Sequence, residues 1–341
     1  MTTQQIQQNA QLNELLVRSK KVLLATHEHA DADAIGSMLA LRESLLGTLD
    51  VAVDTLAPAT VLTQFTFLDG HETIATDATA FRPDRYDCVV LLDCGDVKRT
   101  HLAEKLHFLG VHRPAVALVD HHETMIEFRG AALVDLPIVH TSASSTSELI
   151  YRYLRDNRIS VSPTMATALL AGIVTDTGGF QNMATTVESL DVAGELMNHG
   201  ANLRSVVTAT MRNKSIGTLQ LWGRALSRLE HDTTTGIVST MLTKKDFEEC
   251  GVGREGAEGV ANFLNALGEG TVVLVLREEE HGMVKGSYRT KDPVIDVRVL
   301  AKEHGGGGHK KAAGFSVRGT IEKSAHGWVA VRHTPDQRPV R

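Results

Sequence analysis

The chain has 341 residues, of which 42% are hydrophobic and 22% are charged, and this composition excludes an intrinsically disordered protein. Its length predicts two domains rather than a single core. A net charge of −6 and a pI of about 6.2 argue against a protein that coats long duplex DNA. Three widely spaced cysteines, a polar first segment and the lack of a long apolar run predict a cytoplasmic protein that is not in a membrane.

Charge is unevenly distributed along the chain. Residues 281–341 carry 12 Lys or Arg and 5 Asp or Glu, a net of +7, whereas residues 1–280 carry 23 basic and 36 acidic residues, a net of −13. The difference has two interpretations: chance variation of the solvated surface, or an acidic part that collects metal ions and a basic part that holds phosphates.

The first half of the chain alternates short apolar runs with amphipathic segments. Strands are expected at residues 21–26, 51–54, 87–93 and 115–120. Helices are expected at residues 34–46, 145–154 and 163–174. This alternation predicts an α/β fold with a mostly parallel sheet flanked by helices.

The second half of the chain predicts a smaller α/β domain. Residues 187–230 are polar and helical in pattern, strands are expected at 236–242, 271–276 and 283–288, and a helix at 254–267. The expected boundaries are 1–190 for a catalytic metal-binding domain, 191–235 for a helical connector, 236–325 for a substrate-binding domain and 326–341 for a tail.

One His and two Asp crowd the turn between the first expected strand and helix. His27, Asp31 and Asp33 lie at the carboxyl end of a strand, where open α/β sheets bind their ligands. Without a cation, carboxylates this close together would repel one another. The alternative interpretation is that Asp at a helix start simply caps the helix.

Further candidate ligands follow the next strands. Asp93 ends the third expected strand, although a loop cap is an equal alternative there. Asp120, His121 and His122 follow the fourth strand, and Asp176 ends an apolar helix. Adjacent residues of an extended chain point in opposite directions, so one His can bind metal while the other faces substrate, and Asp120 can orient an imidazole.

Together these residues form a set of oxygen and nitrogen ligands. The set is His27, Asp31, Asp33, Asp93, His121 and Asp176. It suits Mn²⁺, Mg²⁺ or Co²⁺ better than a structural zinc, which favours Cys. Six side chains are too many for one open catalytic metal and suit two metals that share a carboxylate, as in phosphoester hydrolysis.

A glycine run near the C-terminus predicts an anion site. Gly305–Gly308 let the backbone approach a ligand, and His309 follows them directly. A flexible linker is the alternative interpretation of this run. Arg289 precedes it and offers a bidentate contact to phosphate.

These motifs resemble those of the DHH phosphoesterases. His27, Asp31-x-Asp33, Asp93, Asp120-His121-His122 and Asp176 match the family's four motifs in order, and the segment from Gly306 to Phe315 resembles the DHHA1 substrate domain. The size is most similar to the compact branch of oligoribonucleases (nanoRNases) and pAp phosphatases. The resemblance implies a DHH domain and a DHHA1 domain with the active site in the cleft between them.

The resemblance also implies a role for each residue. One metal would be held by His27, Asp31 and Asp93, and the other by Asp33, Asp93, His121 and Asp176. His122 would contact the scissile phosphate, and Asp93 and Asp120 would also belong to the catalytic group. The rest of the substrate would be held by Arg289, His309 and the amides of Gly306, Gly307 and Gly308. The chain departs from the family pattern at His29-Ala30, at Ala32 and at Gln181, and the change at Gln181 leaves substrate preference open.

The expected function is therefore a two-metal phosphodiesterase, with Mn²⁺ as the expected ion and Mg²⁺ or Co²⁺ as alternatives. Its substrates would be short oligoribonucleotides or linear dinucleotides (nanoRNA), hydrolysed to nucleoside 5′-monophosphates, and also pAp. The alternatives are hydrolysis of cyclic dinucleotides or another small phosphate, and a non-catalytic nucleotide-binding regulator. The expected partners are short RNA and a second copy of the chain, with no long duplex DNA and no membrane.

Overall fold

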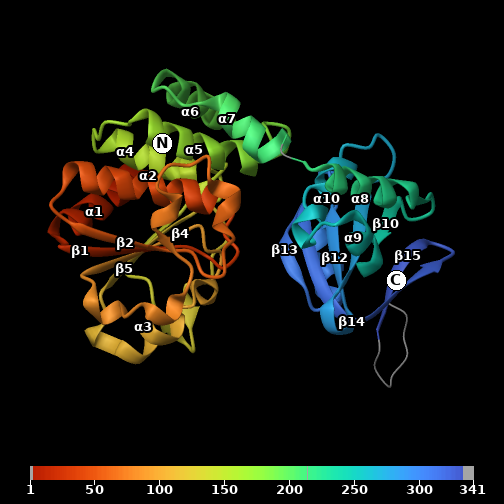
Figure 1. Ribbon diagram of the computed structural model, residues 1–341. Coiled ribbons are helices and arrows are strands. Elements are labelled where there is room, and N and C mark those ends of the chain that lie inside the picture. Colours follow the sequence, from red (N-terminus) through yellow and green to blue (C-terminus); the bar gives the residue numbers. More distant parts are fainter. Residues whose placement is uncertain (1–2, 213, 333–341) are drawn as a thin grey trace. The chain divides into compact units, whose positions relative to one another are not determined.

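The chain divides into two compact units, Met1–Asn213 and Lys214–Arg341 (Figure 1). The computed structural model describes residues 3–212 and 214–332. The segment expected as a connector, 191–235, is shared between the two units, since its first helices pack with the first unit and its last helix with the second.

The first unit is built on a six-stranded sheet in the order β3-β2-β1-β4-β5-β8, and every neighbouring pair is parallel. Its strands are β1 (Lys21–Ala25), β2 (Ala52–Leu56), β3 (Ile74–Ala75), β4 (Cys88–Leu92), β5 (Ala115–Asp120) and β8 (Leu136–Val139). Between β5 and β8, the chain forms a small antiparallel hairpin of β6 (Glu127–Phe128) and β7 (Ala131–Ala132). The expected parallel sheet is confirmed.

Helices cover both faces of this sheet (Figure 1). One face packs against α1 (Thr3–Arg18), α2 (Ala32–Thr48) and α4 (Thr146–Asp156). α5 (Pro163–Asp176) packs against α2 and α4, and α6 (Val187–Asn198) and α7 (Leu203–Val207) pack against α5. The other face packs against α3 (Ala103–Leu109). Because both faces are buried, β1, β4 and β5 are continuous apolar runs rather than alternating ones.

Two glycines let α2 and α5 approach closely. A Cβ on Gly36 of α2 would lie 2.2 Å from the carbonyl oxygen of Ala168 in α5. A Cβ on Gly172 of α5 would lie 2.3 Å from Oδ1 of Asp33 in α2. The two helices can therefore pack this tightly only while both positions lack a side chain.

The second unit has a mixed sheet in the order β13-β14-β12-β11-β10-β9, with β15 paired to β14. Its strands are β9 (Glu230–Asp232), β10 (Ile237–Leu242), β11 (Val272–Glu279), β12 (Met283–Arg289), β13 (Gly307–His309), β14 (Ala312–Ser324) and β15 (Gly327–Arg332). Its helices are α8 (Ile216–Ser227), α9 (Lys244–Cys250), α10 (Val260–Leu264) and α11 (Val297–Glu303). α11 packs on one face of the sheet, and α8, α9 and α10 pack on the other.

The structure differs from expectation at two places in this unit. The helix expected at 254–267 is wrong, because a short 3-10 turn (Arg254–Ala257) is separated from α10 by Gly259, whose φ of +89° is left-handed. Within the segment expected as a tail, residues 327–332 form β15, and residues 333–341 lie outside the described part. Among the described helices, none is long and apolar enough to cross a membrane.

Candidate active site

The candidate site lies at the carboxyl ends of β1, β4 and β5, which are neighbours in the sheet. His27 follows β1, Asp93 follows β4, and His121 follows β5. Carboxyl ends of parallel strands share one edge of a sheet, so segments far apart in sequence meet there. The start of α2 and the end of α5 add Asp33 and Asp176 to the same place.

The first group of ligand atoms comes from His27, Asp31 and Asp93, which lie within 4.8 Å of one another. Nδ1 of His27 lies 2.8 Å from the carbonyl oxygen of Glu28 and 2.9 Å from a guanidinium nitrogen of Arg99. Nε2, the other ring nitrogen of His27, faces the site and lies 3.9 Å from Oδ2 of Asp93. Burial lowers the pKa of His27, which keeps the ring neutral, as a metal ligand must be.

Asp31 has a second role in this group. Its Oδ1 accepts hydrogen bonds from the backbone N–H groups of Asp33 and Ala34, at 3.0 and 3.1 Å. Asp31 is thus the N-cap residue of α2, in addition to its place in the ligand group. A carboxylate has about four acceptor positions, so capping leaves Asp31 able to bind a cation as well.

The second group comes from Asp33, His121 and Asp176, whose ligand atoms also lie within 4.8 Å of one another. Nε2 of His121 is 3.0 Å from Oδ2 of Asp176 and 3.6 Å from Oδ1 of Asp93. This nitrogen is buried and makes no aligned hydrogen bond to any residue that the structure describes. A buried imidazole nitrogen that lies close to two carboxylates but makes no hydrogen bond fits a divalent metal site.

Asp93 connects the two groups. Its Oδ2 faces His27 and its Oδ1 faces His121, so its two oxygens point to different groups. Its backbone has a φ of +52°, a left-handed conformation that few non-glycine residues adopt. Such strain persists where the surrounding structure imposes it, and here it turns the side chain at the end of β4 into the site.

The carboxylates of this site are destabilised in their charged form. Burial, followed by the charge of Asp33, raises the pKa of Asp93 and of Asp176. Burial likewise raises the pKa of Asp33. Asp176 also ends α5, where the negative end of the helix dipole disfavours a carboxylate. Divalent cations would relieve all of these costs, so the residues present fit two metal ions.

His122 is held by two carboxylates. Its Nδ1 lies 2.9 Å from Oδ1 of Asp120 and 3.2 Å from Oδ1 of Asp93. Burial opposes protonation, but these hydrogen bonds raise the pKa of His122 to about 11. Burial would also raise the pKa of Asp120, but hydrogen bonds from His122 and from the amide of Gly95 lower it to about 2. Asp120 and Asp93 therefore fix the orientation of the His122 imidazole at the edge of the site.

Sequence reasoning missed the contribution of α4. The carboxylate of Asp33 accepts hydrogen bonds from the backbone N–H groups of Thr146 (2.6 Å) and Ser147 (2.8 Å), at the start of this helix. The hydroxyl of Thr146 also donates to Oδ1 of Asp93 at 3.1 Å. The sequence did contain a signal for this contribution: the helix start expected at Ser145, whose side chain caps α4. Because a helix N-terminus stabilises carboxylates, this helix start could have been placed next to the acidic residues of the site.

The proposed substrate residues lie in the second unit. Arg289 ends β12, and its Nε donates to Oδ1 of Asn262 at 2.7 Å. Gly307 and Gly308 belong to β13, which pairs with β14, so the glycine run is part of a sheet rather than a flexible linker. A Cβ on Gly306 would lie 2.1 Å from the carbonyl oxygen of Gly314. The side chain of His309 lies outside the described part of the structure.

Of the four departures from the expected motif, His29 and Gln181 are at the surface, whereas Ala30 and Ala32 are buried. His29 is exposed, has a φ of +55°, and its Nδ1 contacts the carbonyl oxygen of Ala59 at 2.9 Å. Gln181 is also exposed. Neither residue displaces a member of the two ligand groups.

The α/β fold, with its His and Asp ligand groups at the strand ends, agrees with the expected class of DHH phosphoesterases. The chain belongs to the DHH family: residues 21–173 match the DHH family N-terminal domain, and residues 227–325 match the DHHA1 domain.

Two relatives are similar over most of their length, and both are named bifunctional oligoribonuclease and PAP phosphatase NrnA. The protein of Thermus thermophilus is 30% identical over 300 residues, covering 87% of this chain and 84% of its own. The protein of Bacillus subtilis is 27% identical over 303 residues, covering 87% and 89%. An exopolyphosphatase-related protein from Bacteroides fragilis has the same fold, with a TM-score of 0.81, 24% identity and 92% of each chain covered.

Proposed function

We propose that this protein is a two-metal phosphodiesterase that hydrolyses short oligoribonucleotides to nucleoside 5′-monophosphates and also removes the 3′-phosphate of pAp. The observation that carries the proposal is the position of Asp93, which offers one oxygen to each of two ligand groups. The names of the two NrnA relatives support the choice of substrates.

We assign the first metal to His27, Asp31 and Asp93, and the second to Asp33, Asp93, His121 and Asp176. Bound there, the ions would activate water and neutralise the charge that develops on the phosphoryl oxygens. Oxygen and imidazole ligands without Cys favour Mn²⁺, with Mg²⁺ or Co²⁺ as alternatives.

The chain's own residues then have distinct tasks. Asp120 holds the His122 ring in one orientation and favours its protonated form. A protonated ring can donate a hydrogen bond to a phosphoryl oxygen, which stabilises negative charge in the transition state. Arg289 offers a planar guanidinium for a second phosphate.

A substrate panel tests this proposal. Dinucleotides, pAp, a twenty-nucleotide RNA and cyclic dinucleotides are each incubated with Mn²⁺, Mg²⁺, Co²⁺ or EDTA, and products are separated by chromatography. We expect nucleoside 5′-monophosphates from dinucleotides and AMP from pAp, with no product in EDTA. Turnover in EDTA would contradict the metal mechanism. Faster hydrolysis of cyclic dinucleotides would reassign the substrate.

Two further expectations belong to the proposal. Cys88, Cys94 and Cys250 are free and buried, which suits the reducing cytoplasm. Self-association to a homodimer is tested by light scattering during gel filtration, and a mass near 36.9 kDa would contradict it.

A further inference from the structure

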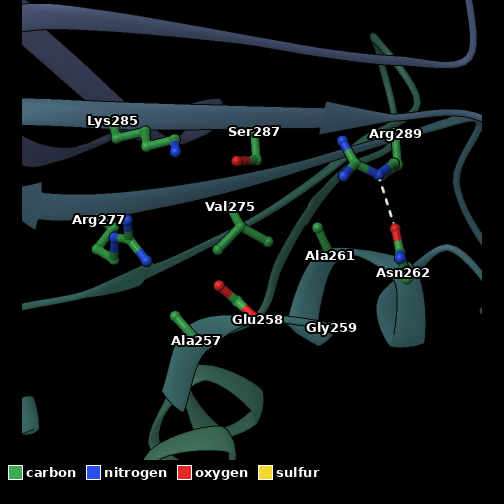
Figure 2. Close-up of a pocket in the computed structure, with 10 residues that line it drawn as sticks. All are labelled: Ala257, Glu258, Gly259, Ala261, Asn262, Val275, Arg277, Lys285, Ser287 and Arg289. Atoms are coloured by element: carbon green, nitrogen blue, oxygen red, sulfur yellow. Dashed lines mark hydrogen bonds between the residues drawn. The ribbon is translucent and has the colours of Figure 1, made fainter. Parts of the chain in front are cut away.

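The second unit contains a pocket that includes Arg289 and extends beyond the residues that the motifs predicted. It encloses about 270 Å³ between the β11–β12 part of the sheet and the segment that leads into α10 (Figure 2). Pockets that enclose a whole organic ligand usually measure ~300–1,000 Å³, so this one suits part of a nucleotide. Arg277 and Lys285 lie toward one end of the view and Arg289 toward the other.

The polar side of the pocket follows from strand geometry. Lys285, Ser287 and Arg289 alternate along β12 and so point to the same face of the sheet. In the register of β11 and β12, Arg277 pairs with Lys285 and Val275 pairs with Ser287. Four residues of strand separate Lys285 from Arg289 by roughly 13 Å, which leaves room for two anionic groups in a row.

Two cations face each other at one end of this pocket. Arg277 and Lys285 are directly opposite on adjacent strands, and like charges in this position destabilise a sheet. Arg277 is partly compensated by an ion pair with Glu279. Lys285 is exposed and makes no ion pair or hydrogen bond within the described ranges. A positive charge without a partner, beside a second cation in a pocket, suits an anionic ligand.

The other end of the pocket has a different environment. Arg289 is hydrogen-bonded to Asn262, and burial lowers its pKa. The described residues place no carboxylate in ion-pair contact with it. Glu258 also lines the pocket, so three cations stand against one carboxylate in the lining. The lining therefore keeps a net positive charge.

We propose that the Arg277–Lys285 end of this pocket is a second anion subsite, which binds a phosphate group of the substrate beyond the one held by Arg289. The inference rests on the proposed function, because it extends the substrate contact from one phosphate to the next along the nucleotide chain. Substrates with two phosphates, such as pAp and a 5′-phosphorylated dinucleotide, need only the active site and Arg289. A 5′-phosphorylated trinucleotide has a third phosphate for Lys285.

Steady-state kinetics of Lys285→Gln test the subsite. Loss of one charged contact lowers kcat/KM for the trinucleotide by about tenfold, while the value for the dinucleotide stays within about twofold. The control is Lys302→Gln, an exposed lysine of the same unit on α11, which packs on the opposite face of the sheet. Lys302→Gln should leave kcat/KM unchanged for both substrates. An equal effect of Lys285→Gln on both substrates, or no effect, would overturn the proposal.

A binding measurement separates this inference from the proposed function. Inorganic phosphate is titrated into the full chain in EDTA, with the methyl signals of two pocket alanines followed by NMR. Ala257 is drawn near Arg277 and Ala261 nearer Arg289 (Figure 2). We expect the Ala257 signal to shift with phosphate, and the shift to be lost in Lys285→Gln but kept in Lys302→Gln. An unchanged Ala257 signal would exclude the subsite even if dinucleotides are hydrolysed. If the Ala257 signal shifts but the protein hydrolyses none of the substrates, the subsite is supported and the proposed function is rejected.

Discussion

At the scale of single residues, Asp93 combines burial, an unusual backbone conformation and several side-chain contacts within the site. It is 2% exposed, its φ is +52°, and its carboxylate contacts His27, His121, His122 and Thr146. A carboxylate this buried is stable in its charged form only when cations surround it. The proposed bridging role between two metal ions would account for both the backbone strain and the burial.

Replacing Asp93 with Asn tests that role. The substitution keeps the size of the side chain but removes the charge, so we expect at least one metal to be lost, together with nearly all turnover. Metal content is measured by mass spectrometry and activity with a dinucleotide. The control is Asp96→Asn, three residues further along, which caps a 3-10 turn and belongs to neither ligand group. A variant with two metals and near-normal activity would contradict the bridging role.

His122→Ala separates the chemistry from metal binding. His122 lies close enough to Asp93 and His121 to form a third ligand group, but its Nδ1 is held by Asp120 and Asp93 and the proposed assignment gives it to neither metal. We therefore expect metal content close to that of the wild type. Hydrolysis should slow by on the order of 10²–10³, the usual effect of losing one donor in the transition state. His121→Ala should instead release a metal. If the metals are lost with His122, the two histidines have been assigned in the wrong order.

At the scale of elements, the contact between α2 and α5 holds Asp33 in place. Gly172→Ala would put a Cβ 2.1 Å from Oγ of Ser147 and 2.3 Å from Oδ1 of Asp33. We expect this overpacking to lower the free energy of unfolding by about 1–3 kcal/mol and to weaken metal binding by displacing Asp33.

The matched control for this contact is Gly194→Ala in α6, where an added Cβ meets nothing within 4 Å. Alanine favours a helix over glycine by about 1 kcal/mol, so this variant should be slightly stabilised. Calorimetry and metal titration of the two variants decide the matter. Wild-type stability and metal affinity in Gly172→Ala would show that the helices can separate without disturbing the site.

In the second unit, Asp246 connects α8 to α9. It accepts hydrogen bonds from Arg224, Arg228 and the N–H of Thr243, and it belongs to a capping box. Burial opposes ionisation, but the hydrogen bonds from Arg228 and Thr243 lower the pKa of Asp246 well below its usual range. A lowered folded-state pKa stabilises the fold above about pH 4, the pKa of an unfolded Asp, and this contribution is lost as the pH falls further.

We therefore expect Asp246→Asn to lower the free energy of unfolding by about 3 kcal/mol at pH 7, and the difference from wild type to shrink as the pH falls from 4 to 2. Urea unfolding is followed by tryptophan fluorescence, because Trp222 and Trp328, the two tryptophans of the chain, both lie in this unit. Glu269→Gln, at an exposed position, serves as the control. A difference that does not depend on pH would mean that charge is not the cause.

The elements predicted from sequence are those whose pattern is set by burial. β1, β4 and β5 are buried on both faces, so their continuous apolar runs were sufficient to predict them as strands. The short β3 and the four-residue β8 have too few residues for a period to be visible. The expected helix at 254–267 failed because Gly259, in a left-handed conformation, interrupts it. Thr146 was missed because its contact with Asp93 joins residues 53 positions apart.

At the scale of the whole molecule, charge and composition limit the length of substrate. The chain has a net charge of −6, and aromatic residues make up only 4% of it. Proteins that hold long single strands combine a positive groove with repeated stacking of bases on aromatic side chains. The cations that we assign to substrate, Lys285 and Arg289 with Arg277, occupy one small pocket rather than an extended track.

We therefore predict that kcat/KM is highest for substrates of two to a few nucleotides and falls as the RNA lengthens. Each added nucleotide beyond the subsites brings a phosphate to an acidic protein without a new contact, so long strands gain repulsion and little binding. Arg289→Ala should raise KM for the short substrates while leaving metal content unchanged, because Arg289 belongs to none of the ligand groups. The measurement is a length series from two to twenty nucleotides at two salt concentrations. Equal or faster hydrolysis of the twenty-nucleotide strand, with a steep loss at high salt, would reveal an extended binding groove and a processive exonuclease.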